Sequence, residues 1–359
     1  MSFRIFATCN IGEDALDRVR ELGYDLEVFA EQEPPGKALI LERVRGGIDG
    51  LITTLRDPID REVFEAGRGT LRVVAQDAVG FDNIDRQAAN DCGIPFTNTA
   101  DVLTHATAEF AFFLLGAVSR KLYPSERIVR ENRWSTWHPF LPILGDEVTG
   151  KTVAVIGTGR IGRAFAVKCT GFQMDILCCD GVEDRTFVSG LQELLDTQSS
   201  LGLSRRRCSA SQVSFEEALE RADYVSLHVP LLPETYHLID AGALRRMKQS
   251  AYLINTSRGP VVDEQALCQA LKERWIAGAA LDVFEREPLP EDSPLRDPEL
   301  TDRLRMFHHF ASATRETRLS PDPEIGMAGR CVQGLIDVLE GNYGGDLRQM
   351  PYVVNKEAF

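Results

Sequence analysis

The sequence lacks several features that would assign the chain to a specialised class of protein. Its 359 residues contain no run of about 20 apolar residues, so no segment is suited to crossing a bilayer. None of the eight cysteines forms a CxxC pair, and the six histidines show no HxxxH or HxxE spacing. We therefore expect free thiols and no bound metal. No positively charged segment followed by a long apolar one begins the sequence, which predicts a cytoplasmic protein.

Positive charge is also scarce. The 40 Lys and Arg residues are outnumbered by 54 Asp and Glu residues, which gives a formal net charge of −14. So acidic a surface would repel phosphate groups, and we expect neither nucleic acid nor an anionic membrane as a partner. Charged residues make up 26% of the chain and hydrophobic residues 43%, the balance of a globular enzyme. The length suits two domains rather than one.

Short apolar runs alternate with helix-like stretches in two separate series along the chain. The first series has strand-like runs at residues 3–9, 25–29, 50–55 and 71–78. The second has strand-like runs at residues 152–156, 174–180, 224–230, 251–256 and 277–283. Strands that alternate with helices at this spacing predict parallel sheets with helices on both faces. The expected fold is therefore α/β, with two Rossmann-like doubly wound domains.

Two segments do not fit this alternation. Residues 102–131 form the longest helical pattern and are apolar nearly all round between Thr107 and Val118. Such a helix needs partners on several sides, which favours a homodimer interface over a core helix that only links two domains. Residues 181–213 are too long for an ordinary loop. We expect a surface helix at residues 191–197, with the remainder mobile and its arginines solvated.

The strongest local signal is a glycine-rich turn between a strand-like run and a helix. Gly157, Gly159 and Gly162 form a G-x-G-x-x-G sequence in this position. The first glycine permits the tight turn, the second lets a pyrophosphate approach the backbone, and the third lets the helix pack on the strand. The amides of Arg160 and Ile161 at the start of the helix would then bind the pyrophosphate.

The end of the next strand-like run bears on the choice of cofactor. Asp180 lies there, 18 residues after Gly162. A carboxylate at this point accepts hydrogen bonds from the ribose hydroxyls of adenosine and repels a 2′-phosphate, which favours NAD over NADP. Arg185 is close enough in sequence to leave NADP as the less favoured alternative. A turn-forming role for Asp180 is the structural alternative.

Polar residues suited to acid–base chemistry follow later strand-like runs. Arg258 comes after the run at 251–256, and its planar guanidinium matches a carboxylate. Asp282 and Glu287 lie at the end of the next run, and His309 follows a short apolar segment. A histidine can move a proton at neutral pH, and a nearby carboxylate favours its protonated form. Parallel sheets place ligands at the carboxyl ends of strands, so these residues are candidates for one site.

Taken in order, these segments resemble the D-isomer-specific 2-hydroxyacid dehydrogenases over nearly the whole chain. The resemblance rests on residues 79–85, 93–99, 157–162, 228–235, 254–259, 281–288 and 309–314. Each segment is modest alone, but their order and spacing are specific. Residues 134–139 and 311–314 are most similar to the glyoxylate and hydroxypyruvate reductase branch. One departure is His308, which stands where the family has proline and is a weaker rival to His309 as the catalyst.

The resemblance implies a role for each candidate residue. Arg258 would bind the substrate carboxylate and keto oxygen. His309 would be the general acid and base, and Glu287, rather than Glu285, would pair with it. Leu55 and the backbone amides of Val79 and Gly80 would contact the substrate. Asp282 would bind the nicotinamide carboxamide, and the other cofactor contacts would be Thr104, His228, Pro230, Thr235 and Thr256.

The resemblance also implies a discontinuous domain layout and an activity. Residues 1–103 and 317–359 would form the substrate domain and residues 104–316 the NAD-binding domain, with the active site in the cleft between them. We expect NAD(P)H-dependent reduction of a small 2-keto acid, of the glyoxylate or hydroxypyruvate type, to the D-2-hydroxy acid. One alternative is a formate- or phosphite-type dehydrogenase, although formate dehydrogenases carry Gln where this chain has Glu287. The other is an NAD(H)-sensing, corepressor-like binding protein.

Overall fold

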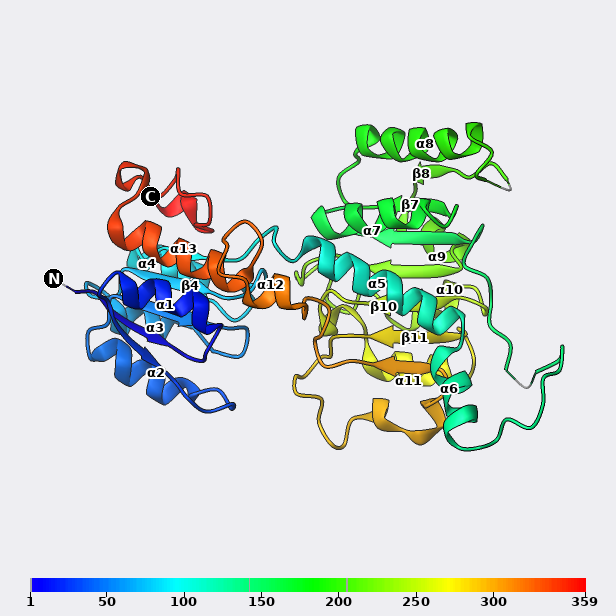
Figure 1. Cartoon of the computed structure of the whole chain (residues 1–359), viewed down its shortest axis with the longest axis horizontal. Helices are drawn as coiled ribbons and strands as arrows, with labels where there is room; N and C mark the ends of the chain where they lie inside the picture. The colour runs from blue at the N-terminus through cyan, green and yellow to red at the C-terminus, as the bar shows by residue number, and fades with distance from the viewer. Residues whose placement is uncertain (1, 142, 205) are drawn as a thin grey trace. The chain divides into compact units, whose positions relative to one another are not determined.

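Two parallel sheets organise the chain, and each belongs to a separate compact unit (Figure 1). The structure is a computed structural model that describes residues 2–141, 143–204 and 206–359. Unit 1 comprises Met1–Thr104 and Ser312–Phe359, and unit 2 comprises His105–Ala311. The chain returns to unit 1 after Ala311, earlier than the expected boundary after residue 316.

Unit 1 contains a five-stranded sheet with the strand order β2-β1-β3-β4-β5. Its strands are β1 (Arg4–Ala7), β2 (Asp25–Val28), β3 (Gly50–Thr53), β4 (Val73–Gln76) and β5 (Phe96–Thr97). Its helices are α1 (Glu13–Glu21), α2 (Gly36–Arg45), α3 (Arg61–Gly67), α4 (Arg86–Cys92), α12 (Arg315–Leu319) and α13 (Met327–Glu340). These strands pair in parallel, and β3 and β4 are buried throughout, as expected for a sheet covered on both faces.

The core of unit 1 is divided into two layers because successive strand residues point to opposite faces. Ile5 and Ala7 of β1 belong to the cluster that includes α1 and α13, whereas Phe6 packs in the cluster that includes α2 and α3. Helix α13, from the end of the chain, packs on β4 and α1 (Figure 1). Segments far apart in the sequence therefore complete one core.

Unit 2 contains a seven-stranded sheet with the strand order β12-β11-β10-β9-β6-β7-β8. Its strands are β6 (Thr152–Ile156), β7 (Asp175–Cys179), β8 (Ala210–Gln212), β9 (Tyr224–Leu227), β10 (Tyr252–Asn255), β11 (Gly278–Leu281) and β12 (Leu304–Met306). Its helices are α5 (Thr104–Ser119), α6 (Leu122–Arg130), α7 (Arg160–Thr170), α8 (Arg185–Ser200), α9 (Phe215–Arg221), α10 (Ala241–Arg246) and α11 (Glu264–Lys272). The chain runs outward from β6 to β8 and then returns to β9, which places a topological switch point beside β6.

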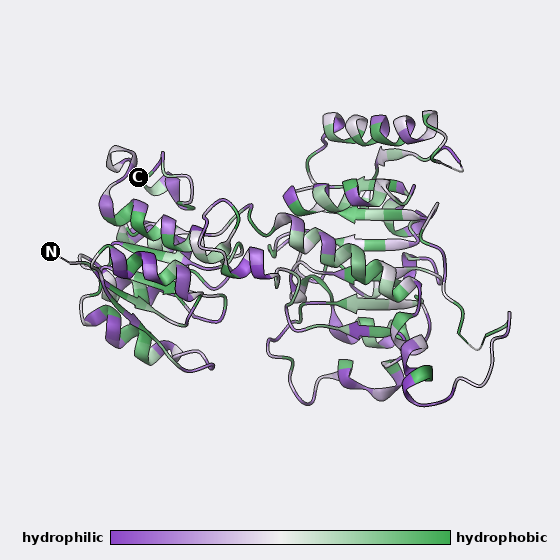
Figure 2. Ribbon diagram, in the orientation of Figure 1, coloured by the Kyte–Doolittle hydropathy of each residue, from purple (hydrophilic) through white to green (hydrophobic). Residues whose placement is uncertain are grey.

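The sheet of unit 2 is apolar on both faces, and Figure 2 shows hydrophobic residues along its strands. Cys178 packs in the cluster that includes α5 and α7, and its neighbour Cys179 packs in the cluster that includes α9 and α10. Adjacent strand residues point to opposite faces, so the two thiols are separated by the sheet. Together, the two parallel-sheet units confirm the predicted α/β class of Rossmann-like fold.

The prediction of one helix across residues 102–131 is wrong. The helical path breaks after α5, and α6 begins at Leu122. Lys121 lies at the break with a φ of 52°, in the left-handed region that a continuous right-handed helix cannot contain. The polar residues Ser119 and Arg120 precede the break, and Pro124 lies near the start of α6, so the sequence carries a signal of the break besides its hydrophobic periodicity.

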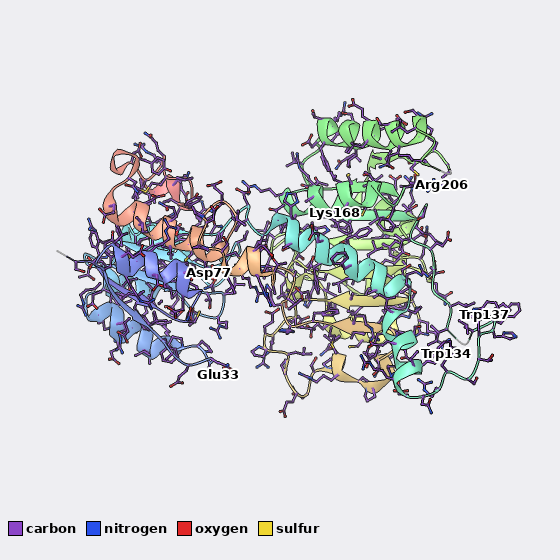
Figure 3. The ribbon with its side chains drawn as sticks, viewed as in Figure 1. Glu33, Asp77, Trp134, Trp137, Lys168 and Arg206 are labelled. Atoms are coloured by element: carbon purple, nitrogen blue, oxygen red, sulfur yellow. The ribbon has the colours of Figure 1, made fainter. Side chains whose placement is uncertain are left out.

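The expectation of a mostly mobile segment at residues 181–213 is also wrong. Helix α8 covers Arg185–Ser200, and β8 adds a parallel edge strand beside β7. Arg206 of this segment is exposed, as expected, but it also makes specific contacts. Arg206, labelled in Figure 3, donates from Nη2 to Asp175 Oδ2 and to the carbonyl of Gly150, both at 2.6 Å. The contact ties the segment to the first residue of β7.

Candidate active site

The glycine-rich turn lies between β6 and α7, and its three glycines differ in what surrounds them. Gly157 has a φ of 92°, and a Cβ there would lie 2.8 Å from the carbonyl carbon and oxygen of His228. A Cβ on Gly162 would lie 1.9 Å from the carbonyl oxygen of Gly157. A Cβ on Gly159 would meet no described atom within 4 Å. Two glycines are therefore required by packing, whereas Gly159 faces open space that a pyrophosphate can approach.

The start of α7 suits an anion. Gly159 is the N-cap and supplies no side-chain cap, and Arg160 and Ile161 begin the first turn. The helix dipole and the first-turn amides favour negative charge at such an end. The glycine cradle and this helix end fit the pyrophosphate of a dinucleotide.

Asp180 follows β7 beside this turn and braces it. Its Oδ2 accepts from the amide of Thr158 (2.6 Å) and from Thr158 Oγ1 (3.1 Å), and its Oδ1 accepts from the amide of Val182 (3.1 Å). A carboxylate is thus fixed next to the glycine turn.

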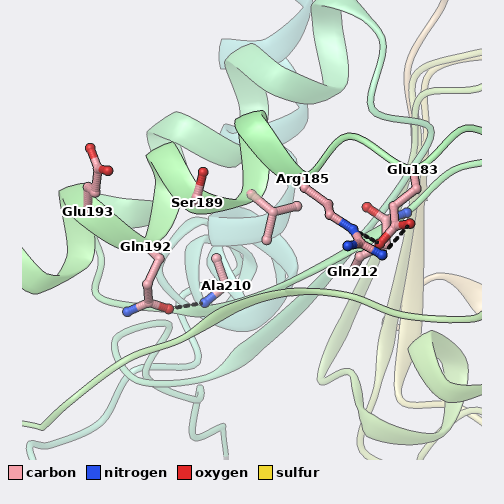
Figure 4. A pocket seen from close by; sticks show the side chains of 8 residues that line it. Glu183, Arg185, Ser189, Gln192, Glu193, Ala210 and Gln212 are labelled. Atoms are coloured by element: carbon pink, nitrogen blue, oxygen red, sulfur yellow. Dashed lines mark hydrogen bonds and ion pairs between the residues drawn. The ribbon is translucent and has the colours of Figure 1, made fainter.

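A shallow hollow of about 560 Å³ lies between α8 and β8 (Figure 4). Arg185 lines it, is 85% exposed, and pairs with Glu183 at 3.0 Å. Gln192 Oε1 accepts from the amide of Ala210 at 2.9 Å across the hollow. The candidate catalytic side chains are not among its lining residues.

The structure joins His309 and Glu287 directly. His309 Nδ1 lies 2.8 Å from Glu287 Oε2, and Glu287 Oε1 accepts from the amide of Phe284 at 3.0 Å. Burial acts to raise the pKa of Glu287, but the hydrogen bond and charge of His309, the Phe284 amide and the charge of Arg258 outweigh it. The net pKa lies below its ordinary value, so Glu287 is ionised at neutral pH. An ionised partner at Nδ1 directs the imidazole Nε2 away from Glu287.

Arg258 is held close to this pair by a tight turn after β10. Asn255, fully buried at the end of β10, donates from Nδ2 to the carbonyl of Arg258 (2.9 Å) and accepts from the amide of Ser257 at Oδ1 (3.0 Å). A Cβ on Gly259 would lie 1.8 Å from the carbonyl carbon of Phe284. The loop of Arg258 and the loop of Glu287 are therefore in close backbone contact.

Asp282 follows β11 and is anchored by backbone amides. Its side chain is fully buried, and its oxygens accept from the amides of Phe310 and Ala311 at 2.7 and 2.8 Å. Burial raises the pKa of Asp282, against the opposing effect of these amides and of the charge of His309. Its predicted contact with the nicotinamide stays a prediction.

The remaining cofactor candidates of unit 2 lie at the ends of β9 and β10. The ring of His228 lies 4.8 Å from that of Phe165 at a tilt of 42°, its Nε2 lies 2.9 Å from Ser226 Oγ, and burial lowers its pKa to about 3. It is therefore neutral at physiological pH. Thr235 Oγ1 donates to the carbonyl of Pro230 at 2.7 Å and braces that turn. Thr256 Oγ1 is buried and has no partner among the described residues.

The other candidates lie in unit 1. Leu55 follows β3, Val79 and Gly80 follow β4, and Thr104 is the first residue of α5. Asn98 Nδ2 donates to the carbonyl of Val79 (2.9 Å), which helps to fix this turn. Their contacts with substrate and cofactor stay predictions.

Two groups of polar residues near the site were not found from the sequence. The first is Asn255. Its position at the end of an apolar strand is a signal that could have identified it from the sequence. The other joins His237 Nε2 to Glu285 Oε1 (3.1 Å), while the amides of Glu264 and Glu285 each donate to the other's carboxylate. Glu285 therefore contacts His237 rather than His309.

No group of His, Cys, Asp and Glu able to hold a metal ion occurs among the described residues. Within the same residues, no helix is long and apolar enough to span a membrane.

A doubly wound sheet, a glycine-rich turn before a helix, and a His–Glu pair beside an arginine define a dinucleotide-binding oxidoreductase. The family model described as "D-isomer specific 2-hydroxyacid dehydrogenase, NAD binding domain" matches residues 112–309. The chain belongs to this family, as the resemblance predicted, and is an NAD(P)-dependent oxidoreductase.

Similar proteins of known sequence and structure support this family membership. The chain is 47% identical over 319 residues to the glyoxylate reductase of Korarchaeum cryptofilum, covering 89% of each chain. It is 38% identical over 361 residues to the glyoxylate reductase of Thermococcus litoralis, covering 99% and 98%. A solved structure, the TT0316 protein from Thermus thermophilus, is 37% identical with a TM-score of 0.82, covering 98% of this chain and 100% of that one.

Proposed function

We propose that the chain reduces a small 2-keto acid of the glyoxylate or hydroxypyruvate type to the D-2-hydroxy acid, with NADH as the cofactor. The observation that carries this proposal is the 2.8 Å contact between His309 and the ionised Glu287 beside the loop of Arg258. This trio combines a proton donor, a carboxylate in contact with that donor, and a cation for an anionic substrate. The names of the relatives, glyoxylate reductases, support the same substrate class.

In the proposed reaction, each of the three side chains has one task. The guanidinium of Arg258 binds the substrate carboxylate through its planar fork and polarises the keto oxygen. NADH, when bound, supplies the hydride that the keto carbon receives. His309 donates its Nε2 proton to the oxygen as it becomes a hydroxyl, while Glu287 stabilises the imidazolium from the Nδ1 side. The reverse reaction uses neutral His309 as the base.

The preference for NAD is supported by the surroundings of Asp180. Its carboxylate is fixed by Thr158 and Val182, so it cannot swing away from a 2′-phosphate without breaking three hydrogen bonds. Arg185, the nearby candidate for a phosphate ligand, is paired with Glu183. We therefore expect a higher kcat/KM with NADH than with NADPH, and Asp180→Ser should reduce this preference.

The test uses the purified full chain with NADH or NADPH and a panel of glyoxylate, hydroxypyruvate and pyruvate, followed by cofactor absorbance. We expect oxidation of NADH with glyoxylate or hydroxypyruvate. Arg258→Ala should abolish turnover while NADH still binds in a fluorescence titration. Absence of turnover with every keto acid, or reduction of NAD by formate, would overturn the proposal.

We further propose a homodimer that works in the cytoplasm. Exposed apolar side chains on α5 and α6 and in the segment after α6 support the dimer. They are Phe113, Leu122, Tyr123, Val129, Trp134, Trp137 and Phe140. All eight cysteines are free thiols, which suits a reducing compartment. Sedimentation of the purified chain and fractionation of cells that express it test the two parts.

A further inference from the structure

Arg163, near the start of α7, contacts three groups with one guanidinium. Its Nε donates to the carbonyl oxygen of Thr158 at 2.8 Å, inside the glycine-rich turn. Its Nη2 lies 2.6 Å from Asp184 Oδ2, and its guanidinium carbon lies 4.9 Å from the centre of the Phe187 ring. An isolated ion pair at a half-exposed position orders a side chain only weakly. The carbonyl and the ring add two further contacts, so Arg163 is restricted to one orientation.

The carbonyl that Arg163 binds belongs to the peptide that leads into α7. A trans peptide is planar, and its carbonyl and its amide hydrogen point in opposite directions. The carbonyl of Thr158 and the amide of Gly159 share one such peptide, so Arg163 also determines where that amide points. The amide of Gly159 has no hydrogen-bond partner among the residues that the structure describes. Because Asp180 accepts from the amide of Thr158 at 2.6 Å, opposite charges hold the peptides on either side of Thr158.

Asp184 connects this contact to the segment at residues 181–213. It is the N-cap of α8, where its Oδ1 accepts from the amide of Phe187 at 2.9 Å, while its Oδ2 accepts from Arg163. Each carboxylate oxygen therefore has a partner of its own. One oxygen stabilises the start of α8, and the other holds the guanidinium of Arg163. The first turn of α8 thus supplies both the carboxylate and the aromatic ring that orient Arg163.

We propose that Arg163 is a positioning residue for the cofactor, and that the start of α8 holds it on the glycine-rich turn through Asp184 and Phe187. Arg163 contacts the turn, so it determines how tightly the dinucleotide binds and leaves the chemical step unchanged. The proposal rests on the proposed function in taking NADH as the cofactor. It gives the segment at residues 181–213 a part in cofactor affinity.

The experiment measures the NADH dissociation constant of the full chain by fluorescence titration. Arg163→Met keeps an unbranched stem but removes the guanidinium, and it should raise the constant about ten-fold, the effect of one lost charge-assisted hydrogen bond. Asp184→Asn keeps an N-cap for α8 but removes the charge beside Arg163, and it should raise the constant about three-fold. In both variants, KM for NADH should rise with the dissociation constant, whereas kcat at saturating NADH should not fall.

Two further variants separate this role from a general effect of surface charge. Arg207, which follows α8, is 80% exposed and lies 3.6 Å from Asp196, so Arg207→Met should leave the dissociation constant unchanged. Combining Arg163→Met with Asp184→Asn should give the constant of Arg163→Met alone, because Asp184 acts through Arg163.

An unchanged dissociation constant in Arg163→Met, or an equal rise in Arg207→Met, would overturn the proposal. Additive losses in the double variant would also overturn it, because Asp184 would then act independently of Arg163. If Arg163→Met does not fold, Asp184→Asn decides alone, and a wild-type constant in that variant contradicts the proposal. A wild-type chain that binds NADH but reduces no keto acid contradicts only the proposed function, whereas one that does not bind NADH overturns both.

Discussion

At Glu287, two opposing effects act on one carboxyl group. Burial favours the neutral acid, but the contact with His309 and the nearby charge of Arg258 favour the carboxylate, and the pKa is lowered. The carboxylate is therefore retained well into the acid range. Protonation of Glu287 is therefore not expected to limit activity near neutral pH.

Glu287→Gln tests this argument. The variant retains a hydrogen-bonding side chain but removes the charge that stabilises the imidazolium. We expect kcat for reduction to fall by about a hundred-fold. The kcat is measured at saturating NADH and keto acid. Glu285→Gln removes the same charge two residues away and should leave kcat unchanged; an equal loss of kcat in both variants would point to a general electrostatic effect.

Asp77 makes stability depend on pH at the end of β4. Its Oδ1 is buried without a partner among the described residues, and burial raises its pKa to about 7 against the opposing charge of Arg318. In the unfolded chain, an Asp titrates near about 3.9. The folded state thus binds this proton more tightly, so the stabilisation is complete below about pH 4 and is lost as the pH rises to about 7.

Asp77→Asn should therefore flatten the dependence of stability on pH. Wild-type stability should fall by up to about 1.4 kcal/mol for each pH unit within this window, whereas the uncharged variant has no proton to lose at this position. Urea unfolding at about pH 5 and about pH 8 measures the difference. Asp25→Asn, an exposed residue at the start of β2, is the control. Equal pH dependence in wild type and Asp77→Asn would contradict the argument.

Residue types and their places after strands were readable from the sequence, but their hydrogen bonds were not. Glu287 and His309 were expected to pair, and the structure places them in contact. The left-handed φ of His309 and the hydrogen bonds from the amides of Phe310 and Ala311 to Asp282 had no sequence signal. They depend on contacts between segments nearly thirty residues apart. The residue types indicated the candidate site residues, whereas tertiary contacts determine how their side chains are oriented.

At the scale of elements, the turn between β6 and α7 contains one glycine that packing requires and another that faces open space. A Cβ on Gly162 would collide with a backbone oxygen at 1.9 Å, whereas a Cβ on Gly159 has no described neighbour within 4 Å. The same substitution, glycine to alanine, should therefore have different consequences at the two positions.

Gly162→Ala should destabilise the chain by about 3 kcal/mol, because α7 must move away from β6. Gly159→Ala should change stability by no more than about 1 kcal/mol, since its backbone conformation suits any residue. It should nevertheless weaken NADH binding, because the methyl group occupies the approach of the pyrophosphate. Urea unfolding and fluorescence titration of both variants measure the two effects. Normal NADH binding in Gly159→Ala would place the pyrophosphate elsewhere.

Strands and their order along the chain were the most predictable elements. Buried parallel strands read as continuous apolar runs, and the runs at residues 152–156, 224–230 and 251–256 each contain a strand. The edge strand β8 was missed because its three residues are only partly buried. The break at Lys121 was missed although the polar residues Ser119 and Arg120 precede it and Pro124 follows it. Periodicity thus identifies the centre of a sheet better than its edges.

For the whole molecule, self-association is the proposal that concerns the exposed apolar side chains of unit 2. Phe113 on α5 is 64% exposed and Val129 on α6 is 60% exposed. Trp134 and Trp137, in the segment after α6, are exposed by 61% and 74% (Figure 3). We propose that these exposed apolar side chains contribute to an interface between two copies of the chain. Part of the apolar surface of α5, including Phe113, is therefore not covered by unit 2.

A stable dimer buries about 800 Å² on each partner, more than one helix face provides. Both the helices and the aromatic segment must therefore contribute. We expect the wild-type chain to sediment as a dimer, and Phe113→Glu combined with Val129→Glu to sediment as a folded monomer, because two charges per chain would be buried without partners. Leu201→Glu, at an equally exposed apolar position after α8, should remain dimeric. A wild-type monomer, or a double variant that stays dimeric, would show that α5 and α6 do not form the interface.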